Sequence, residues 1–179
     1  MHFHLGVVGK RGSGKTLFCK YLSEKYGYEI LRFSNILKEI AEQQYPDKEI
    51  TKKFLQDFGL KMKKEYGKDF LAKKILEKVE EGKKYVFDGL RELEEFFTLK
   101  KRLKILLIYI HADDQIRFQR LKKRDNINFE NFKIADSHPV EKNIEKFKDM
   151  AEFVLINNFS KSEEFYKKID ELMEKIKKL

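Results

Sequence analysis

Apolar residues in this chain gather in two kinds of segment, short continuous runs and longer stretches with helical spacing. The short runs predict five β-strands, at residues 3–8, 29–33, 85–87, 105–110 and 153–156. In the longer stretches apolar residues recur three or four positions apart, as in Leu17, Tyr21 and Leu22, which predicts helices between the strands. Strands that alternate with helices build βα units with right-handed crossovers and a parallel sheet covered on both faces. The expected fold class is therefore α/β.

Two segments interrupt this alternation. Helical spacing continues without a strand over residues 34–66, between the second and third predicted strands. Residues 125–139 have mixed polarity and weak periodicity. A chain of 179 residues corresponds to about one domain. We therefore expect residues 1–179 to form a single domain that contains both segments.

Composition excludes several classes of protein. Hydrophobic residues make up 41% of the chain and include 16 Phe, which excludes a disordered chain. Cys19 is the only cysteine, so we expect neither a disulfide framework nor a cysteine-based zinc site. The longest apolar run, residues 105–110, is far shorter than the ~20 residues that span a bilayer, and no signal-peptide pattern is visible. These features predict a soluble, cytoplasmic protein with no membrane partner.

The net charge of +9 favours a negatively charged partner. A positive field suits nucleic acids and phosphorylated small molecules alike. The chain has no aromatic-rich basic strand of the kind that binds nucleic acid, so we favour a small nucleotide.

A phosphate-binding motif follows the first predicted strand and opens the first predicted helix. The pattern G-x-x-x-x-G-K-[ST] is matched in full by Gly9, Lys10, Arg11, Gly12, Ser13, Gly14, Lys15 and Thr16. Glycines let backbone amides converge on phosphate oxygens, and the start of the helix adds partial positive charge. We expect these residues to bind ATP, with Lys15 on the β- and γ-phosphates and Thr16 on Mg²⁺.

The motif alone does not select a reaction, because GTPases, motor ATPases and small-molecule kinases share it. No Asn-Lys-x-Asp sequence, the guanine-reading motif, is present in the chain. A motor or helicase core needs more strands than 179 residues accommodate. A small-molecule kinase, which is a phosphotransferase, is the expected class.

Two further sites carry charge near the expected ligand. Asp88 ends the third predicted strand, at the edge of the sheet where ligands bind, and can orient water on Mg²⁺. Arg91 can make a bidentate contact with a phosphate. Arg117, Arg120 and Arg124 lie in the helix after the fourth strand, where cations would stabilise a transferring phosphoryl group.

With these motifs in this order, nearly the whole chain resembles the nucleoside monophosphate kinases. The closest likeness is to archaeal adenylate-kinase-related proteins and deoxynucleoside monophosphate kinase-like domains. The resemblance rests on the phosphate loop, on Asp88-Gly89-Leu90-Arg91, on the Arg120 and Arg124 pair, and on the segment 151–158, which ends in two asparagines. It implies a three-layer P-loop kinase fold, with five parallel strands in the order 2-3-1-4-5. It also implies a helical monophosphate-binding arm at residues 34–67 and a short lid at residues 125–139.

The resemblance also implies roles for individual residues. Arg91 would hold the acceptor phosphate, and Arg124 would reach the transferring group. Arg120 would stack near the donor adenine or contact phosphate, and Asn157 would border the adenine. In the arm, the substrate-binding candidates are Ser34 and Lys38.

The chain departs from the family pattern in two places. Lys38 stands where such kinases often have arginine, and a lysine cannot reproduce a bidentate fork. The 125–139 segment contains no arginine; its candidate cations are Lys133 and His138.

Two other functions stay open. The run from Arg120 to Asp125 also resembles dephospho-coenzyme A kinase, although the second strand lacks that family's Asp-x-Asp. A third possibility, from another class, is a nucleotide-binding protein associated with nucleic acid. Neither the acceptor nor the oligomeric state follows from the sequence.

Overall fold

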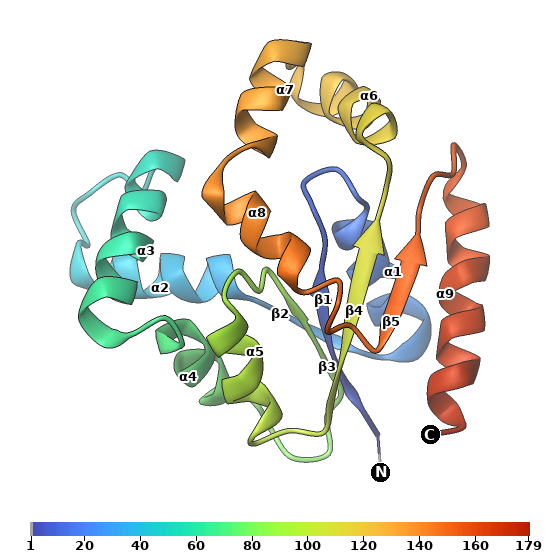
Figure 1. Cartoon of the computed structure of the whole chain (residues 1–179). Coiled ribbons are helices and arrows are strands. Elements are labelled where there is room, and N and C mark those ends of the chain that lie inside the picture. The colour runs from blue at the N-terminus through green and yellow to red at the C-terminus, as the bar shows by residue number, and fades with distance from the viewer. Residues whose placement is uncertain (1) are drawn as a thin grey trace.

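The computed structural model describes residues 2–179 and contains one five-stranded sheet with helices around it (Figure 1). The strands are β1 (His4–Val8), β2 (Glu29–Arg32), β3 (Tyr85–Asp88), β4 (Ile105–His111) and β5 (Phe153–Ile156). All neighbouring pairs are parallel, and the strand order is β2-β3-β1-β4-β5. The predicted fold class and strand order are both confirmed.

Nine helices are described in residues 2–179. They are α1 (Lys15–Tyr26), α2 (Phe33–Gln44), α3 (Lys52–Tyr66), α4 (Phe70–Leu76), α5 (Leu93–Lys100), α6 (Asp114–Asp125), α7 (Phe129–Asp136), α8 (Pro139–Lys146) and α9 (Ser162–Lys177). None of the helices in this part of the chain is long and apolar enough to cross a membrane.

Alternating side chains along the strands build a core on each face of the sheet. On β4, Leu106 and Ile108 pack in a cluster with residues of α1 and α9, whereas Leu107 and Tyr109 pack in a second cluster with residues of α2, α4, α5 and α8. The molecule therefore has three layers, helix, sheet and helix. A third, small cluster around Ala41, Phe58 and Met62 joins α2 to α3.

One carboxylate links the two helices that cover the first face of the sheet, in addition to their apolar packing. Asp170 of α9 accepts hydrogen bonds from Tyr21 and Tyr26 and pairs with Lys25, all three on α1. Burial opposes the ionisation of Asp170, but hydrogen bonds from Lys25 and the two tyrosines outweigh it and hold its pKa below the ordinary value. This contact fixes α9 against the helix that begins at the phosphate loop.

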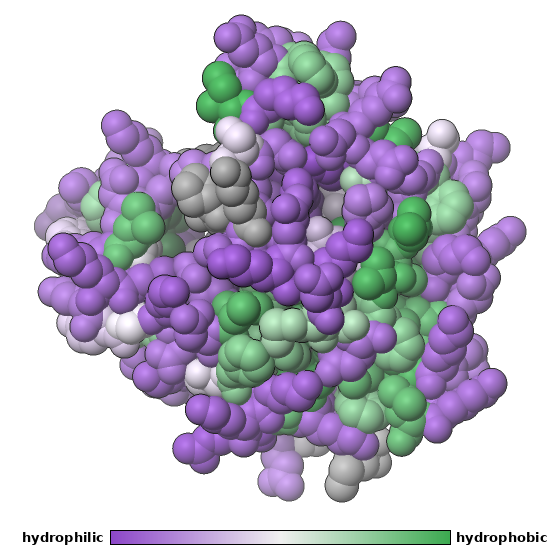
Figure 2. All heavy atoms as spheres, viewed as in Figure 1, coloured by the Kyte–Doolittle hydropathy of each residue, from purple (hydrophilic) through white to green (hydrophobic). Residues whose placement is uncertain are grey.

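Strand β5 forms one edge of the sheet, and the side chains on one of its two faces are exposed. Val154 and Ile156 are 42% and 54% exposed, and Figure 2 shows a hydrophobic area on this side of the molecule. Leu155, which lies between them, points into the core shared with α1 and α9. The edge strand is therefore buried on one face only, unlike β1 and β4.

The segment 125–149 is more regular than its pattern indicated. The weak periodicity of residues 125–139 predicts no regular element, but the structure has α7 there, followed directly by α8. Asn128 caps α7 by accepting a hydrogen bond from the Asn131 amide at 2.8 Å. Phe132 is buried under Phe118 and Phe129. Two turns of helix with one buried side chain are too short to show a clear 3.6-residue repeat.

Candidate active site

The loop of residues 9–14 connects β1 to α1 in a conformation that needs glycine. Gly12 has φ +84° and Gly14 has φ +107°, in the region that side-chain-bearing residues rarely adopt. A Cβ on Gly14 would also collide with the side-chain amide of Asn157. Within this tight loop the Ser13 hydroxyl is buried and has no hydrogen-bond partner among the described residues. An unused donor and a helix N-terminus in one concavity fit a bound phosphate.

Lys15 is folded back onto this loop. Its Nζ donates hydrogen bonds to the carbonyl oxygens of Gly9 at 2.6 Å and Lys10 at 3.2 Å. Burial and the nearby Arg91 guanidinium lower the pKa of Lys15 to about 8. An ammonium held this way, partly stripped of water and close to another cation, would be stabilised by an anion in the loop.

Arg120 and Asn157 brace the loop from the other side. The Asn157 side-chain amide donates to the Ser13 carbonyl at 2.8 Å. The Arg120 guanidinium donates to the carbonyls of Gly12, Asn157 and Phe159, at 3.2, 3.0 and 2.9 Å. Burial lowers the pKa of Arg120. These contacts connect the end of β5 to the phosphate loop, so Arg120 acts on the loop's shape as well as on its charge.

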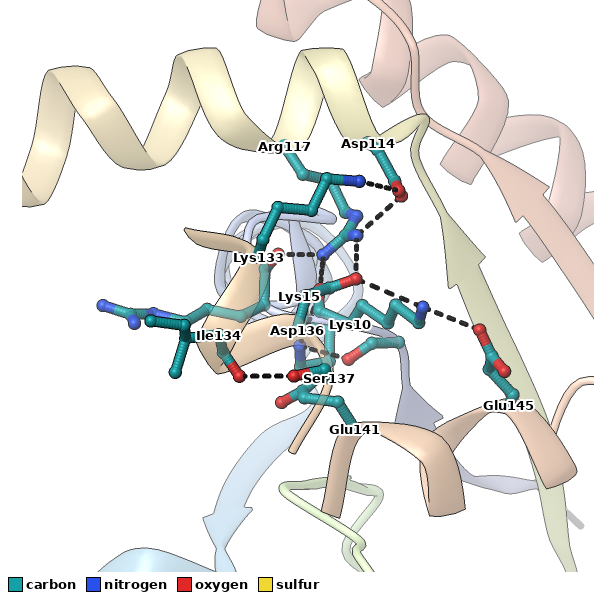
Figure 3. A network of polar contacts seen from close by, with 12 residues as sticks. Lys10, Lys15, Asp114, Arg117, Lys133, Ile134, Asp136, Ser137, Glu141 and Glu145 are labelled. Carbon is teal, nitrogen blue, oxygen red and sulfur yellow. Dashed lines mark hydrogen bonds and ion pairs between the residues drawn. The ribbon is translucent and has the colours of Figure 1, made fainter. Parts of the chain in front are cut away.

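A second arginine supports the loop through α7 (Figure 3). Arg117, 1% exposed, holds Asp136 through two hydrogen bonds of 2.6 and 2.9 Å. It also donates to Asp114 at 2.7 Å and to the Arg11 carbonyl at 3.1 Å. Burial works against the charge on Arg117, yet these carboxylates raise its pKa above the ordinary value. The sequence placed Arg117 on this helix but did not indicate that its partner is Asp136.

Asp88 lies where the sequence predicted, at the end of β3 and next to Val7 of β1. One of its carboxylate oxygens pairs with Arg32 Nε at 3.4 Å. Thr16 follows Lys15 in the first turn of α1. Both side chains offer the oxygen ligands that Mg²⁺ prefers, so the donor set fits this ion.

Several predicted residues share one cavity of about 370 Å³ beside the loop. Its lining includes Arg11, Gly12, Gly14, Lys15, Thr16, Arg91, Arg120, Arg124 and Asn157. Ser34 and Lys38 do not line this cavity. Both are exposed, and Lys38 pairs with Glu42 at 3.5 Å on its own helix. Arg124 is bound to its neighbour Asp125, which also pairs with Arg11.

Arg91 lies in the same cavity as Lys15 but already has a carboxylate partner. Its guanidinium contacts Glu141 of α8 at 3.2 Å, and its backbone amide donates to the buried Glu95 at 2.8 Å. Burial raises the pKa of Glu95. Sequence reasoning missed Glu141, because nothing in the pattern around residue 141 shows that α8 turns towards the phosphate loop.

Comparison with known proteins identifies the family to which this chain belongs. The family model described as "AAA domain" matches residues 5–140. A protein called "UPF0200 protein" in Sulfurisphaera tokodaii is 32% identical over 176 residues, which covers 96% of this chain and 96% of that protein. The chain is a UPF0200 protein with an AAA domain. That family name states no reaction.

Solved structures identify the fold of this UPF0200 chain. A dephospho-CoA kinase from Campylobacter jejuni aligns with a TM-score of 0.57 and 17% identity, over 97% of this chain and 96% of that one. A shikimate kinase from Acinetobacter baumannii, in complex with shikimate, aligns with a TM-score of 0.55 and 15% identity, over 97% and 93%. The chain therefore has the P-loop kinase fold, and the two neighbours' different substrates show that this fold does not select the acceptor.

Proposed function

We propose that this protein is a phosphotransferase that moves the γ-phosphoryl group of ATP to a nucleoside or deoxynucleoside monophosphate. The observation that carries the proposal is that Lys15 of the phosphate loop and Arg91 line one cavity. An enzyme that only hydrolyses ATP has no acceptor phosphate to bind, so it needs cations only at the donor phosphates. A guanidinium opposite the loop offers a second place for a phosphate, which an acceptor monophosphate would fill.

In this proposal the loop amides and Lys15 bind the donor phosphates, and Thr16 and Asp88 hold Mg²⁺, Asp88 through water. Bound Mg²⁺ would neutralise charge on the donor phosphates. Arg124 would approach the transferring group once it leaves Asp125, and Arg120 and Asn157 would keep the loop in shape beside the adenine. Because the attacking group is itself an ionised phosphate, the reaction needs positioning and charge neutralisation more than a general base.

The segments 34–67 and 125–139 would serve as acceptor arm and lid. The small core joins α3 to α2, but α2 also contributes Phe33 and Ile36 to the sheet core, so movement of the arm would have to shift α2 against the sheet. Ser34 and Lys38 are exposed on α2, so they would reach an acceptor only after such a movement. Closure of arm and lid would exclude water and prevent simple hydrolysis of ATP.

Dephospho-coenzyme A kinase is the second candidate. The run from Arg120 to Asp125, which resembles that family, favours it. Its acceptor is not a nucleoside monophosphate, so one experiment separates the two candidates.

The test is a transfer assay with γ-labelled ATP and Mg²⁺ against each nucleoside and deoxynucleoside monophosphate and against dephospho-coenzyme A. We expect label on a monophosphate, and Lys15→Ala should lower turnover about 100- to 1,000-fold, the effect of removing one transition-state donor. Lys20→Ala is the matched control, because Lys20 lies on the same helix, is 68% exposed and pairs with Glu24. Label on dephospho-coenzyme A alone would select the second candidate. Normal turnover in Lys15→Ala would reject the loop as donor site.

A further inference from the structure

Helix α8 carries two carboxylates that contact cations of the phosphate site. Glu145 lies 2.6 Å from Lys10 of the loop, and Glu141 lies 3.2 Å from Arg91. The two are four residues apart, so they share one face of the helix. That face is turned towards the loop (Figure 3). We call Glu141 and Glu145 the α8 carboxylates.

The first of the pair is buried in the candidate active site. Glu141 lines the same cavity as Lys15 and Thr16, and its side chain is 12% exposed. Its Oε2 is buried and has no hydrogen-bond partner among the described residues. Burying a carboxylate with one oxygen unpaired is costly, so packing stability does not account for its position. The positive charges of Arg91 and Lys15 offset part of the cost of burying the Glu141 carboxylate.

A carboxylate offers a guanidinium the same paired oxygens as a phosphate does. Lys10 and Arg91 are a loop cation and an acceptor-side cation of the proposed reaction, and both are engaged by one helix. A ligand phosphate that reaches Arg91 must therefore replace Glu141, and one that draws on Lys10 must compete with Glu145. Lys10 contacts two carboxylates, Glu145 and Asp136, which raise its pKa against the effect of burial.

We propose that the α8 carboxylates are internal stand-ins for substrate phosphates: they inhibit the nucleotide-free protein by occupying Arg91 and Lys10, and nucleotide binding displaces them. This inference rests on the proposed function, since it takes the loop as the donor site. Ile144 and Phe147 are buried in the sheet core, so backbone displacement is confined to the first turn of α8, which carries Glu141. Glu145 lies between these two anchors and would be displaced by a change of its side-chain conformation alone. The contacts of one helix, α8, would then change when either substrate site is filled.

The first measurement is calorimetric binding of a non-hydrolysable ATP analogue with Mg²⁺. We expect Glu145→Gln to tighten binding of the analogue about three- to tenfold, and Glu141→Gln to tighten binding of a nucleoside monophosphate at Arg91 by a similar factor, because a competing internal anion lowers the competent fraction. Glu130→Gln is the matched control. It removes the same charge from α7, where Glu130 is exposed, and should change affinity less than twofold. Unchanged or weaker binding in both α8 variants, or equal tightening in the control, would overturn the proposal.

The second measurement is hydrogen exchange at residues 137–143. Exchange should be faster in ligand-free Glu141→Gln than in the wild type, and the analogue should accelerate it in the wild type. Slower hydrogen exchange at these residues when the analogue binds would overturn the proposal that binding displaces the α8 carboxylates. Absence of analogue binding in every variant would instead reject the proposed function, while the ligand-free comparison would still test the contact between α8 and the site.

Discussion

Replacing Arg117 by alanine should cost a large share of the protein's stability. The side chain is 1% exposed and makes two short hydrogen bonds to Asp136, which is 13% exposed. Removing one partner of a buried pair costs about 3–5 kcal/mol, because the other charge stays buried and unpaired. Asp114 is 58% exposed and adds little. Lys10, at 3.4 Å from Asp136, compensates in part and favours the lower end of the range.

For a chain of this size, 1 kcal/mol corresponds to roughly 2–4 °C, so Tm should fall by about 6–20 °C. Denaturant and thermal unfolding followed by circular dichroism would measure it. Arg124→Ala is the control, since that side chain is 60% exposed on the same helix and should change stability by less than about 0.5 kcal/mol. The double variant Arg117→Met, Asp136→Leu should recover much of the loss. A loss under about 1 kcal/mol in Arg117→Ala, or strictly additive single and double variants, would refute this account of the pair.

Three further results are expected. Gly14→Ala should weaken ATP binding at least about tenfold, because backbone strain of about 1–3 kcal/mol adds to the collision with Asn157; calorimetry showing unchanged affinity would contradict the loop geometry. Asp88→Asn should weaken ATP binding more with Mg²⁺ than without it, and equal losses would make Asp88 a turn residue only. The pKa of Asp170 is lower in the folded state, so its contribution to stability is present above about pH 4 and is lost as pH falls through the folded pKa. Asp170→Asn should therefore be less stable than the wild type at pH 7, the difference should shrink as the pH falls below about 4, and a pH-independent difference in unfolding free energy would contradict this.

The parallel sheet could be read from sequence because its strands are buried. A strand covered on both faces appears as a continuous apolar run, as residues 105–110 do, and a βα alternation leaves few topologies. The phosphate loop was equally predictable from sequence, because it is one contiguous segment and its backbone conformation requires glycine. The strand order came from the family resemblance rather than from the pattern.

The contacts around the loop could not be read in the same way. Arg117 meets Asp136, and Arg91 meets Glu141, across 19 and 50 residues of chain. Such pairs depend on the path of α7 and α8, two helices of eight residues each, in a stretch with little periodic signal. From sequence alone, charged residues on short helices are expected to be exposed to solvent. Only the tertiary structure shows which of them face inward.

The central position of β1 also sets the order of events during synthesis. β1 is made first, but it pairs on one side with β3 and on the other with β4. At roughly 5–20 residues per second, the ribosome needs about 5–20 s to make the ~100 residues that separate Val8 from His111. For most of that interval, until β3 is complete at Asp88, the apolar segment that leads into the phosphate loop has no neighbouring strand, and its second neighbour is complete only at His111. The amide of Asn157, which holds the loop at Ser13, emerges later still. A nascent chain therefore lacks this support for the phosphate loop until Asn157 has been made.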